Sequence, residues 1–231
     1  MKKNIVSLMI VLLAAALYAA TTSARIHPNL PEFRFNVTQS DENVSIDVFQ
    51  GNKKIQILKA DGMSVNYTQI AAADFFKNGI WLEDFNFDGY KDLAVLVSQG
   101  VTGNFYVKVF IYDTAKKNFV HNVDFSNIPS PRLDKTKRII RGFEKGGAAG
   151  LIFKSSVYLV VRGQPVLQFS MVQDLLKSGD YKFFKRTVSE RINGKLVIIC
   201  EFVVTVEGCT VKPVKIIKGT KALVQKYLQE R

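Results

Sequence analysis

The stretch Asp84-Phe85-Asn86-Phe87-Asp88-Gly89-Tyr90-Lys91-Asp92 leads directly into the apolar run Leu93-Ala94-Val95-Leu96-Val97. Oxygen-bearing side chains stand at every second position at the start of this stretch, a spacing that lets them surround a single cation. Gly89 stands where a calcium loop needs its sharp turn. We therefore expect an ion-binding loop that feeds into a β-strand.

Ca²⁺ is the ion that this loop predicts, because hard oxygens without His or Cys argue against zinc. The loop is not an EF-hand, since Val95 stands where an EF-hand has its closing Glu. So many protein ligands leave little room for substrate, so the ion is expected to be structural. An Asx-rich turn with solvated carboxylates is the alternative. The expected calcium ligands are Asp84, Asn86, Asp88, the backbone carbonyl of Tyr90, and Asp92.

The first residues have the pattern of a secretion signal. Lys2 and Lys3 precede the apolar stretch 5–20, and Thr22-Ser23-Ala24 forms a small-residue cleavage site. We expect residues 1–24 to be a signal peptide, cleaved before Arg25, and residues 25–231 to form a single mature domain. With no cysteine near the cleavage point to carry a lipid, the product is expected to be soluble and periplasmic, without a stable membrane anchor.

The chain is basic, with 32 Lys and Arg against 20 Asp and Glu. Loss of Lys2 and Lys3 with the leader lowers the net charge from +12 to +10. The charge favours an anionic partner: an acidic protein, a cell-wall polymer or a phosphorylated lipid surface. A nucleic acid is not expected in that compartment, and the chain has no basic helix or aromatic RNA-binding signature.

Two cysteines are present, Cys200 and Cys209. They stand in what reads as a strand, a tight turn and a returning strand. An even cysteine count in an oxidising compartment predicts one disulfide, Cys200–Cys209. Two free or metal-binding thiols are the alternative.

Short segments with a two-residue alternation dominate the chain and predict a mainly β fold. Turn signals such as Gly51-Asn52 separate them. The architecture expected is a set of small β-propeller-like or sandwich-like antiparallel sheets with a calcium loop and a short C-terminal helix. Helical signals are sparse: residues 71–76 and 172–178 suggest one or two turns each, and the strongest pattern is 221–228.

Catalysis has little support in the sequence, and we expect no enzyme. His27 and His121 read as surface residues, and no serine stands in a G-x-S-x-G turn. Glu83 and Asp84 are neighbours on a strand, so their side chains point to opposite faces and cannot act as a glycosidase pair.

An ordered series of motifs between residues 81 and 150 resembles a known family. It consists of Asp84-x-Asn86-x-Asp88-Gly89-x-x-Asp92-Leu93, Phe105-Tyr106, Phe110-x-Tyr112-Asp113, Asn118-Phe119, and Pro129-Ser130-Pro131-x-x-Asp134. The series resembles exported β-propeller-like proteins with a VCBS/FG-GAP-type calcium loop. It is most similar to periplasmic immunity proteins that neutralise lysozyme-like effectors of bacterial type IV secretion systems, whose fold looks like that of the type I periplasmic lysozyme inhibitors.

The resemblance implies a calcium-binding inhibitor that sterically blocks a peptidoglycan-cleaving, lysozyme-like enzyme. Because a basic inhibitor repels a basic lysozyme, an acidic or mixed-charge target fits better. A binding module for cell-wall or surface polysaccharide is the alternative.

An inhibitor needs a protruding loop, and three loops qualify: 99–106, 143–150 and 177–181. Each is also compatible with an ordinary interstrand turn. Tyr106 and Tyr181 are the expected aromatic anchors, since aromatic side chains dominate interface energies. The candidate partner-binding residues are Thr102, Asn104, Tyr106 and Tyr181.

Overall fold

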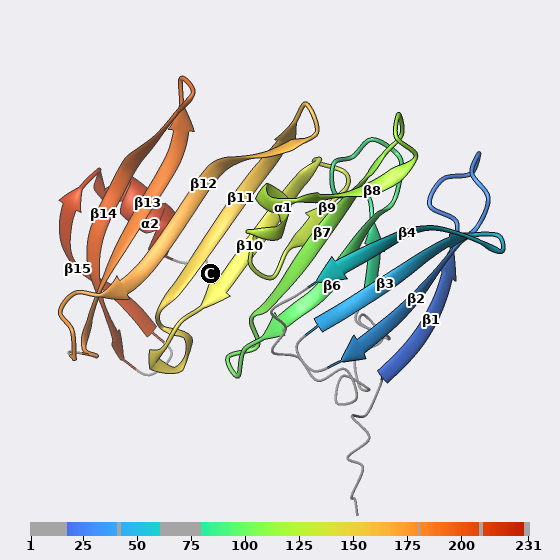
Figure 1. Cartoon of the computed structure of the whole chain (residues 1–231). Helices are drawn as coiled ribbons and strands as arrows, with labels where there is room; N and C mark the ends of the chain where they lie inside the picture. The colour runs from blue at the N-terminus through green and yellow to red at the C-terminus, as the bar shows by residue number, and fades with distance from the viewer. Residues whose placement is uncertain (1–17, 41–42, 61–79, 180, 208–209, 229–231) are drawn as a thin grey trace, which may run out of the picture.

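The fold is mainly β, as predicted, with three antiparallel sheets and a short C-terminal helix. The computed structural model describes residues 18–40, 43–60, 80–179, 181–207 and 210–228. Within these residues no helix is long and apolar enough to span a bilayer. Each sheet is a meander in which neighbouring strands pair in chain order (Figure 1).

The first sheet is formed by the N-terminal strands, whose inward positions alternate with outward ones. Phe33, Phe35 and Val37 are buried on one strand, and Val44, Ile46 and Val48 on the next. The sheet contains β1 (Tyr18–Ala24), β2 (Phe33–Ser40), β3 (Asn43–Gln50) and β4 (Lys53–Ala60).

The last seven residues of the predicted signal peptide form the edge strand β1. This strand pairs with β2 from Tyr18↔Gln39 to Ala24↔Phe33. Cleavage after Ala24, which stays a prediction, would remove β1 and leave β2 at the edge of the sheet.

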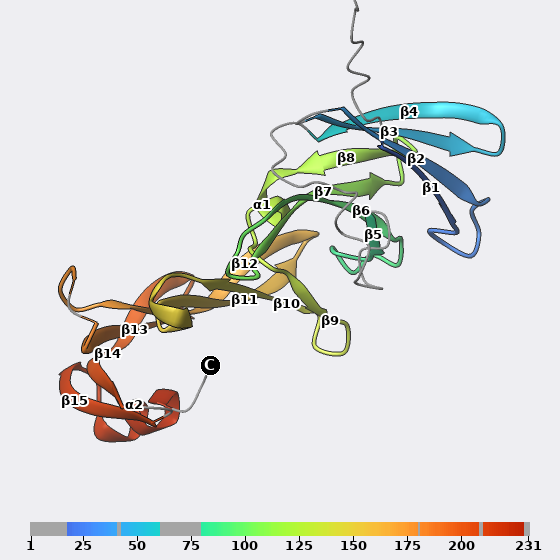
Figure 2. The same ribbon diagram turned by 90° about the horizontal axis from the view of Figure 1, so that it is seen from below.

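The second sheet carries the stretch 84–92, which we call the Asp-rich loop, at the junction of its first two strands. Its strands are β5 (Ile80–Glu83), β6 (Asp92–Gln99), β7 (Phe105–Asp113) and β8 (Asn118–Asn122). Helix α1 (Val123–Ser126) follows and is capped by Asn122, whose side chain accepts from the N–H of Phe125. Figure 2 shows the first and second sheets as stacked layers.

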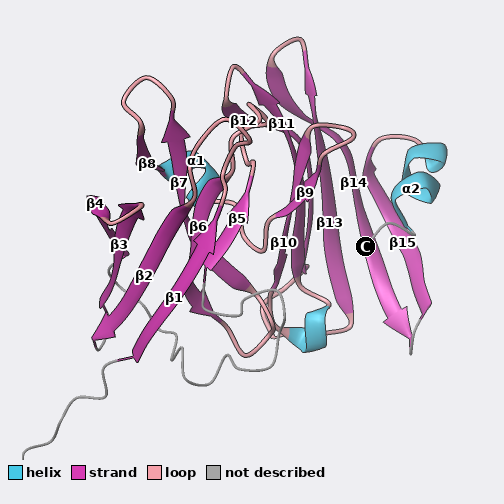
Figure 3. Ribbon diagram, turned by 90° about the vertical axis from the view of Figure 1, so that its right-hand side faces the viewer, coloured by secondary structure: helices cyan, strands magenta, loops and turns pink. Residues whose placement is uncertain are grey.

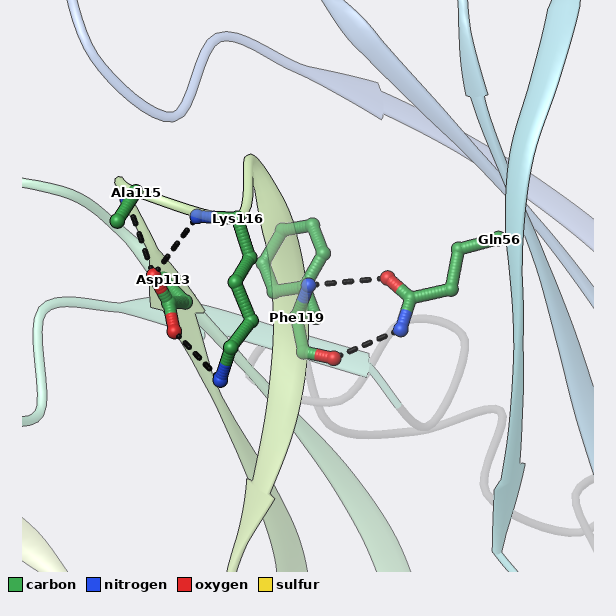
Figure 4. A network of polar contacts seen from close by, with 5 residues as sticks. All are labelled: Gln56, Asp113, Ala115, Lys116 and Phe119. Atoms are coloured by element: carbon green, nitrogen blue, oxygen red, sulfur yellow. Dashed lines mark hydrogen bonds and ion pairs between the residues drawn. The ribbon is translucent and has the colours of Figure 1, made fainter.

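Gln56 joins these two layers across 63 residues of sequence. Its side-chain amide donates to the carbonyl of Phe119 at 2.7 Å, and its carbonyl oxygen accepts from the Phe119 N–H at 2.9 Å (Figure 4). The side chain thus pairs with β8 as a strand would. Nearby, Asp113 closes the β7–β8 turn by accepting from the N–H groups of Ala115 and Lys116.

The third sheet has seven strands and extends away from the other two (Figures 1 and 2). A 3-10 turn, Ala148–Gly150, lies between its second and third strands. The strands are β9 (Arg132–Asp134), β10 (Ile139–Lys145), β11 (Phe153–Val161), β12 (Gln164–Leu175), β13 (Phe183–Ile192), β14 (Lys195–Glu207) and β15 (Thr210–Lys218).

Helix α2 (Lys221–Leu228) matches the predicted C-terminal helix in its bounds and lies beside β14 and β15 (Figure 3). Val224 and Tyr227 are its buried residues. The helical turns expected at 172–178 are wrong for residues 172–175, which continue β12 because they pair with β13. The segment 71–76 lies outside the described residues.

The predicted Cys200–Cys209 disulfide is contradicted by the structure, in which Cys200 is a buried, free thiol. Strand β14 runs without interruption from Cys200 to Glu207, which places those residues about 23 Å apart. Cys209 lies outside the described residues. A disulfide needs Cα atoms within about 7 Å, so Cys200 lies too far from the Glu207 end of β14 to be bridged to it.

Candidate functional site

The Asp-rich loop is folded around its own carboxylates. One oxygen of Asp84 accepts from the N–H of Asp88 at 3.0 Å and the other from the N–H of Gly89 at 2.8 Å. Asn86 accepts from the Asp88 N–H at 3.1 Å, and Asp88 accepts from the N–H of Tyr90 at 2.8 Å. Gly89 has a φ of +95°, so the sharp turn predicted there is confirmed.

Asp92 closes the loop from inside the core, where it is fully buried. Its two oxygens accept one backbone N–H each, from Phe85 at 2.8 Å and from Tyr112 at 2.9 Å. Burial raises the pKa of this carboxyl to about 7, and the negative charges of Asp88 and Asp84 add to the rise. Burial also raises the pKa of Asp84.

The donor set fits a hard cation, although the described residues hold no preformed cluster of three or more His, Cys, Asp or Glu side chains around a point. The loop has three carboxylates and one amide, and carboxylate oxygens that accept one N–H keep a further lone pair. The Tyr90 ring is stacked between His27 and Tyr112, with centroid distances of 4.2 and 5.7 Å. Calcium binding stays a prediction, and the oxygen ligands of this loop are of the type that calcium prefers.

The β6–β7 hairpin presents a tip at the other end of β6, about 23 Å along the strand from Asp92. Two backbone bonds close its turn: Gly100 donates to Asn104 and Gly103 donates back to Gly100, both at 2.9 Å. Val101 at the tip is fully exposed. The sequence predicted this loop with Thr102 and Asn104 among its partner-binding residues, whereas the exposed residue at the tip is Val101, which stands between Gly100 and Gly103.

Asn104 is buried and fastens the hairpin to the third sheet, so it does not offer its amide to a partner. Its side chain donates to the carbonyl of Lys145 and accepts from the Lys145 N–H, both at 2.7 Å. Tyr106 adds a second connection by donating its hydroxyl to Glu144 at 2.8 Å. Two of the three predicted loops, 99–106 and 143–150, are therefore joined in one place.

A cavity of about 460 Å³ opens where these loops meet. Thr102 contributes from the hairpin, and the β10–β11 loop supplies most of the rest. The lining residues are Thr102, Phe143, Lys145, Gly146, Gly147, Ala149, Gly150 and Phe153.

Tyr181 lies apart from this cavity but at the same end of the third sheet. Tyr181 belongs to the connection between β12 and β13, which begins after Leu175. The β10–β11 loop ends at Phe153, which pairs with Gln173 near that same end of β12. The side chain of Tyr181 is 63% exposed. The structure thus places the three predicted loops at one end of the molecule, with two in contact and one separate.

No family model and no curated protein sequence matches the chain. A solved structure described as that of a Xanthomonas type IV secretion system related protein is similar to it. The two are 16% identical, the similarity covers 79% of this chain and 99% of the other, and the TM-score is 0.48.

Proposed function

We propose that this protein is an exported, calcium-binding inhibitor that sterically blocks a peptidoglycan-cleaving, lysozyme-like enzyme. The observation that carries the proposal is the β6–β7 hairpin tip, where a fully exposed Val101 stands on a tightly bonded turn. An exposed valine is unfavourable in water and gains free energy when it enters a cleft.

The hairpin tip is preorganised for insertion. Asn104 and Tyr106 bond its base to β10, so little conformational entropy remains to be lost when a partner closes around it. Thr102 stands beside Val101, where it can make polar contacts at the rim of a cleft.

The calcium ion supports the scaffold rather than the contact. Asp84, Asn86, Asp88, the carbonyl of Tyr90 and Asp92 would hold it at the opposite end of β6 from the tip. Its positive charge would offset the negative charges of Asp88 and Asp84, which add to the effect of burial in raising the pKa of Asp92, so binding would stabilise the junction of β5 and β6.

The net charge is +12 for the whole chain and +10 without Lys2 and Lys3 of the leader, and it favours a target with an acidic cleft, since like charges slow the encounter with a basic enzyme. The same charge favours an anionic cell-wall polymer, which is the competing partner. A pull-down of the chain on purified peptidoglycan, without any enzyme, separates the two partners.

The test is an inhibition assay with purified lysozyme-like hydrolases of acidic and of basic isoelectric point. Val101→Asp should weaken inhibition of the acidic target at least about tenfold, because it places a charge in the buried centre of the contact. Val123→Asp is the matched control, since Val123 is 57% exposed at the start of α1 and far from the tip in sequence. Equal inhibition by both variants, or no inhibition of any hydrolase by the wild type, overturns the proposal.

A further inference from the structure

A second cavity, of about 420 Å³, lies between the second and third sheets, and we call it the Trp81 cavity. Residues from β5, β7 and β9 line it, together with the turn that follows β9. It shares no lining residue with the cavity beside the β6–β7 tip. The lining residues are Trp81, Glu83, Phe105, Pro131, Arg132, Leu133 and Lys135.

Four of the seven lining residues are apolar. Trp81 comes from β5 and Phe105 from β7, two strands that β6 separates in the second sheet. Pro131, just before β9, and Leu133 of β9 complete the apolar lining. Small-molecule sites are typically of this size and are lined by apolar and aromatic side chains with a few polar groups. The body of a matching ligand is therefore a ring with an apolar face.

The charged residues of the cavity leave a positive charge uncompensated. Lys135 is paired with Glu83 at 2.6 Å, so these two cancel. Arg132 has no ion-pair partner among the residues that the structure describes.

The neighbouring strand increases this imbalance. Arg141 stands directly opposite Arg132 in the β9–β10 register. Like charges in such a cross-strand pair are destabilising, and a bound anion relieves the repulsion. Both arginines are exposed, so an anion can reach them.

We propose that the Trp81 cavity binds a sugar that carries a carboxylate. The guanidinium of Arg132 pairs with the carboxylate, for which its planar fork of donors is suited. The aromatic rings of Trp81 and Phe105 contact the apolar face of the sugar ring, and the Lys135–Glu83 pair offers a donor and an acceptor to its hydroxyl groups. The cavity does not depend on the proposed inhibition, because the β6–β7 tip is not part of it.

The chain contains a single tryptophan, so the fluorescence of Trp81 reports directly on this cavity. The probes are N-acetylmuramic acid and N-acetylglucosamine, which differ by the carboxylate-bearing lactyl group. N-acetylmuramic acid should change the fluorescence in a saturable way and bind at least about tenfold more tightly, which is the effect of one charge-assisted hydrogen bond.

Arg132→Gln should lower the affinity for N-acetylmuramic acid to that for the neutral sugar. Arg162→Gln is the matched control, because Arg162 is exposed in the β11–β12 turn and does not line the cavity. Titration calorimetry on the same samples detects binding that leaves the fluorescence of Trp81 unchanged. Circular dichroism confirms that both variants are folded.

Three results overturn the inference: no saturable signal by either method, equal affinity for the two sugars, or equal losses in the two variants. Displacement by inorganic phosphate at the same concentration would reduce the site to one for any anion, which also overturns the sugar assignment. Each of these outcomes leaves the inhibition assay with Val101→Asp unaffected, so the two proposals fail separately.

Discussion

At the scale of single residues, Asp92 carries the largest electrostatic cost in the Asp-rich loop. It is fully buried, and both of its oxygens accept backbone N–H groups, from Phe85 and Tyr112. These bonds tie the loop to β7 and favour the charged form, while burial opposes it more strongly and raises the pKa to about 7.

Asp92→Asn tests this balance. The substitution removes the charge but turns an amide N–H₂ toward one of the two backbone donors, which loses its acceptor. We expect a loss of about 1–3 kcal/mol in the free energy of unfolding, measured by urea denaturation at pH 7 without calcium. If the Asp92→Asn variant were as stable as the wild type, the expected loss would be contradicted. The free energy gained by removing the buried charge would then equal the free energy lost with the hydrogen bond to the backbone N–H.

The pH dependence of stability follows from the same pKa. A carboxyl whose pKa is higher in the folded state than in the unfolded chain binds its proton more tightly when folded, so stability falls as the pH rises from about 4 to about 7. His121 acts in the opposite direction, because burial lowers its pKa. The difference between wild type and Asp92→Asn isolates the contribution of Asp92, and a difference that does not change over this range contradicts the raised pKa.

At the scale of elements, the β6–β7 hairpin depends on one buried side chain. Asn104 replaces strand pairing between the hairpin base and β10 by bonding both backbone groups of Lys145. Helix α2 depends on a similar arrangement, since the buried Arg186 of β13 donates to the carbonyls of Tyr227 and Leu228 and to Gln173. Asn104 and Arg186 thus supply hydrogen-bond partners to backbone groups that are not paired with a neighbouring strand.

Asn104→Ala should therefore loosen the hairpin tip while the sheets remain intact. Two backbone groups of Lys145 lose their partners, at a cost of about 1–3 kcal/mol. Amide hydrogen exchange should accelerate at Lys145 and in the turn 100–103, and inhibition should weaken because the tip is less ordered before binding. Asn52→Ala, in the exposed β3–β4 turn, is the control. Unchanged exchange at Lys145 would show that the two hydrogen bonds between Asn104 and Lys145 contribute nothing to the order of the hairpin tip.

At the scale of the whole molecule, the buried apolar residues form two clusters. The larger lies among the first two sheets and reaches Ile140 and Tyr158 of the third, and it contains Phe85 and Phe87 of the Asp-rich loop. The smaller lies between the third sheet and α2, around Phe184, Phe202 and Tyr227. The seven-stranded sheet connects them, but their side chains pack separately.

Calcium should consequently stabilise one part of the molecule. At a concentration of about 100 times its dissociation constant, a ligand of the folded state adds about 2.7 kcal/mol. Thermal melting should shift upward with calcium and downward with chelator, and hydrogen exchange should slow in β5–β8 but not in β13–β15. An unchanged melting curve rejects the calcium site, and uniform slowing shows that the two clusters unfold together.

The sequence by itself determined the features that near neighbours control. The alternation of Val44, Ile46 and Val48 predicts a strand, Gly89 predicts the sharp turn, and the spacing of Leu223, Val224 and Tyr227 predicts α2. Strand β13 has a weaker pattern in the sequence, because the buried Arg186 stands between Phe184 and Val188 and the inward-facing positions are therefore not all apolar.

Only the tertiary structure decided which distant segments meet. It placed Asn104 beside Lys145 and Trp81 beside Arg132, and it left Cys200 as a buried, free thiol. Such contacts depend on how whole sheets pack against one another, and no local pattern of residues encodes that packing. The chemistry of each loop could therefore be predicted from its residues, whereas its orientation and its neighbours could not.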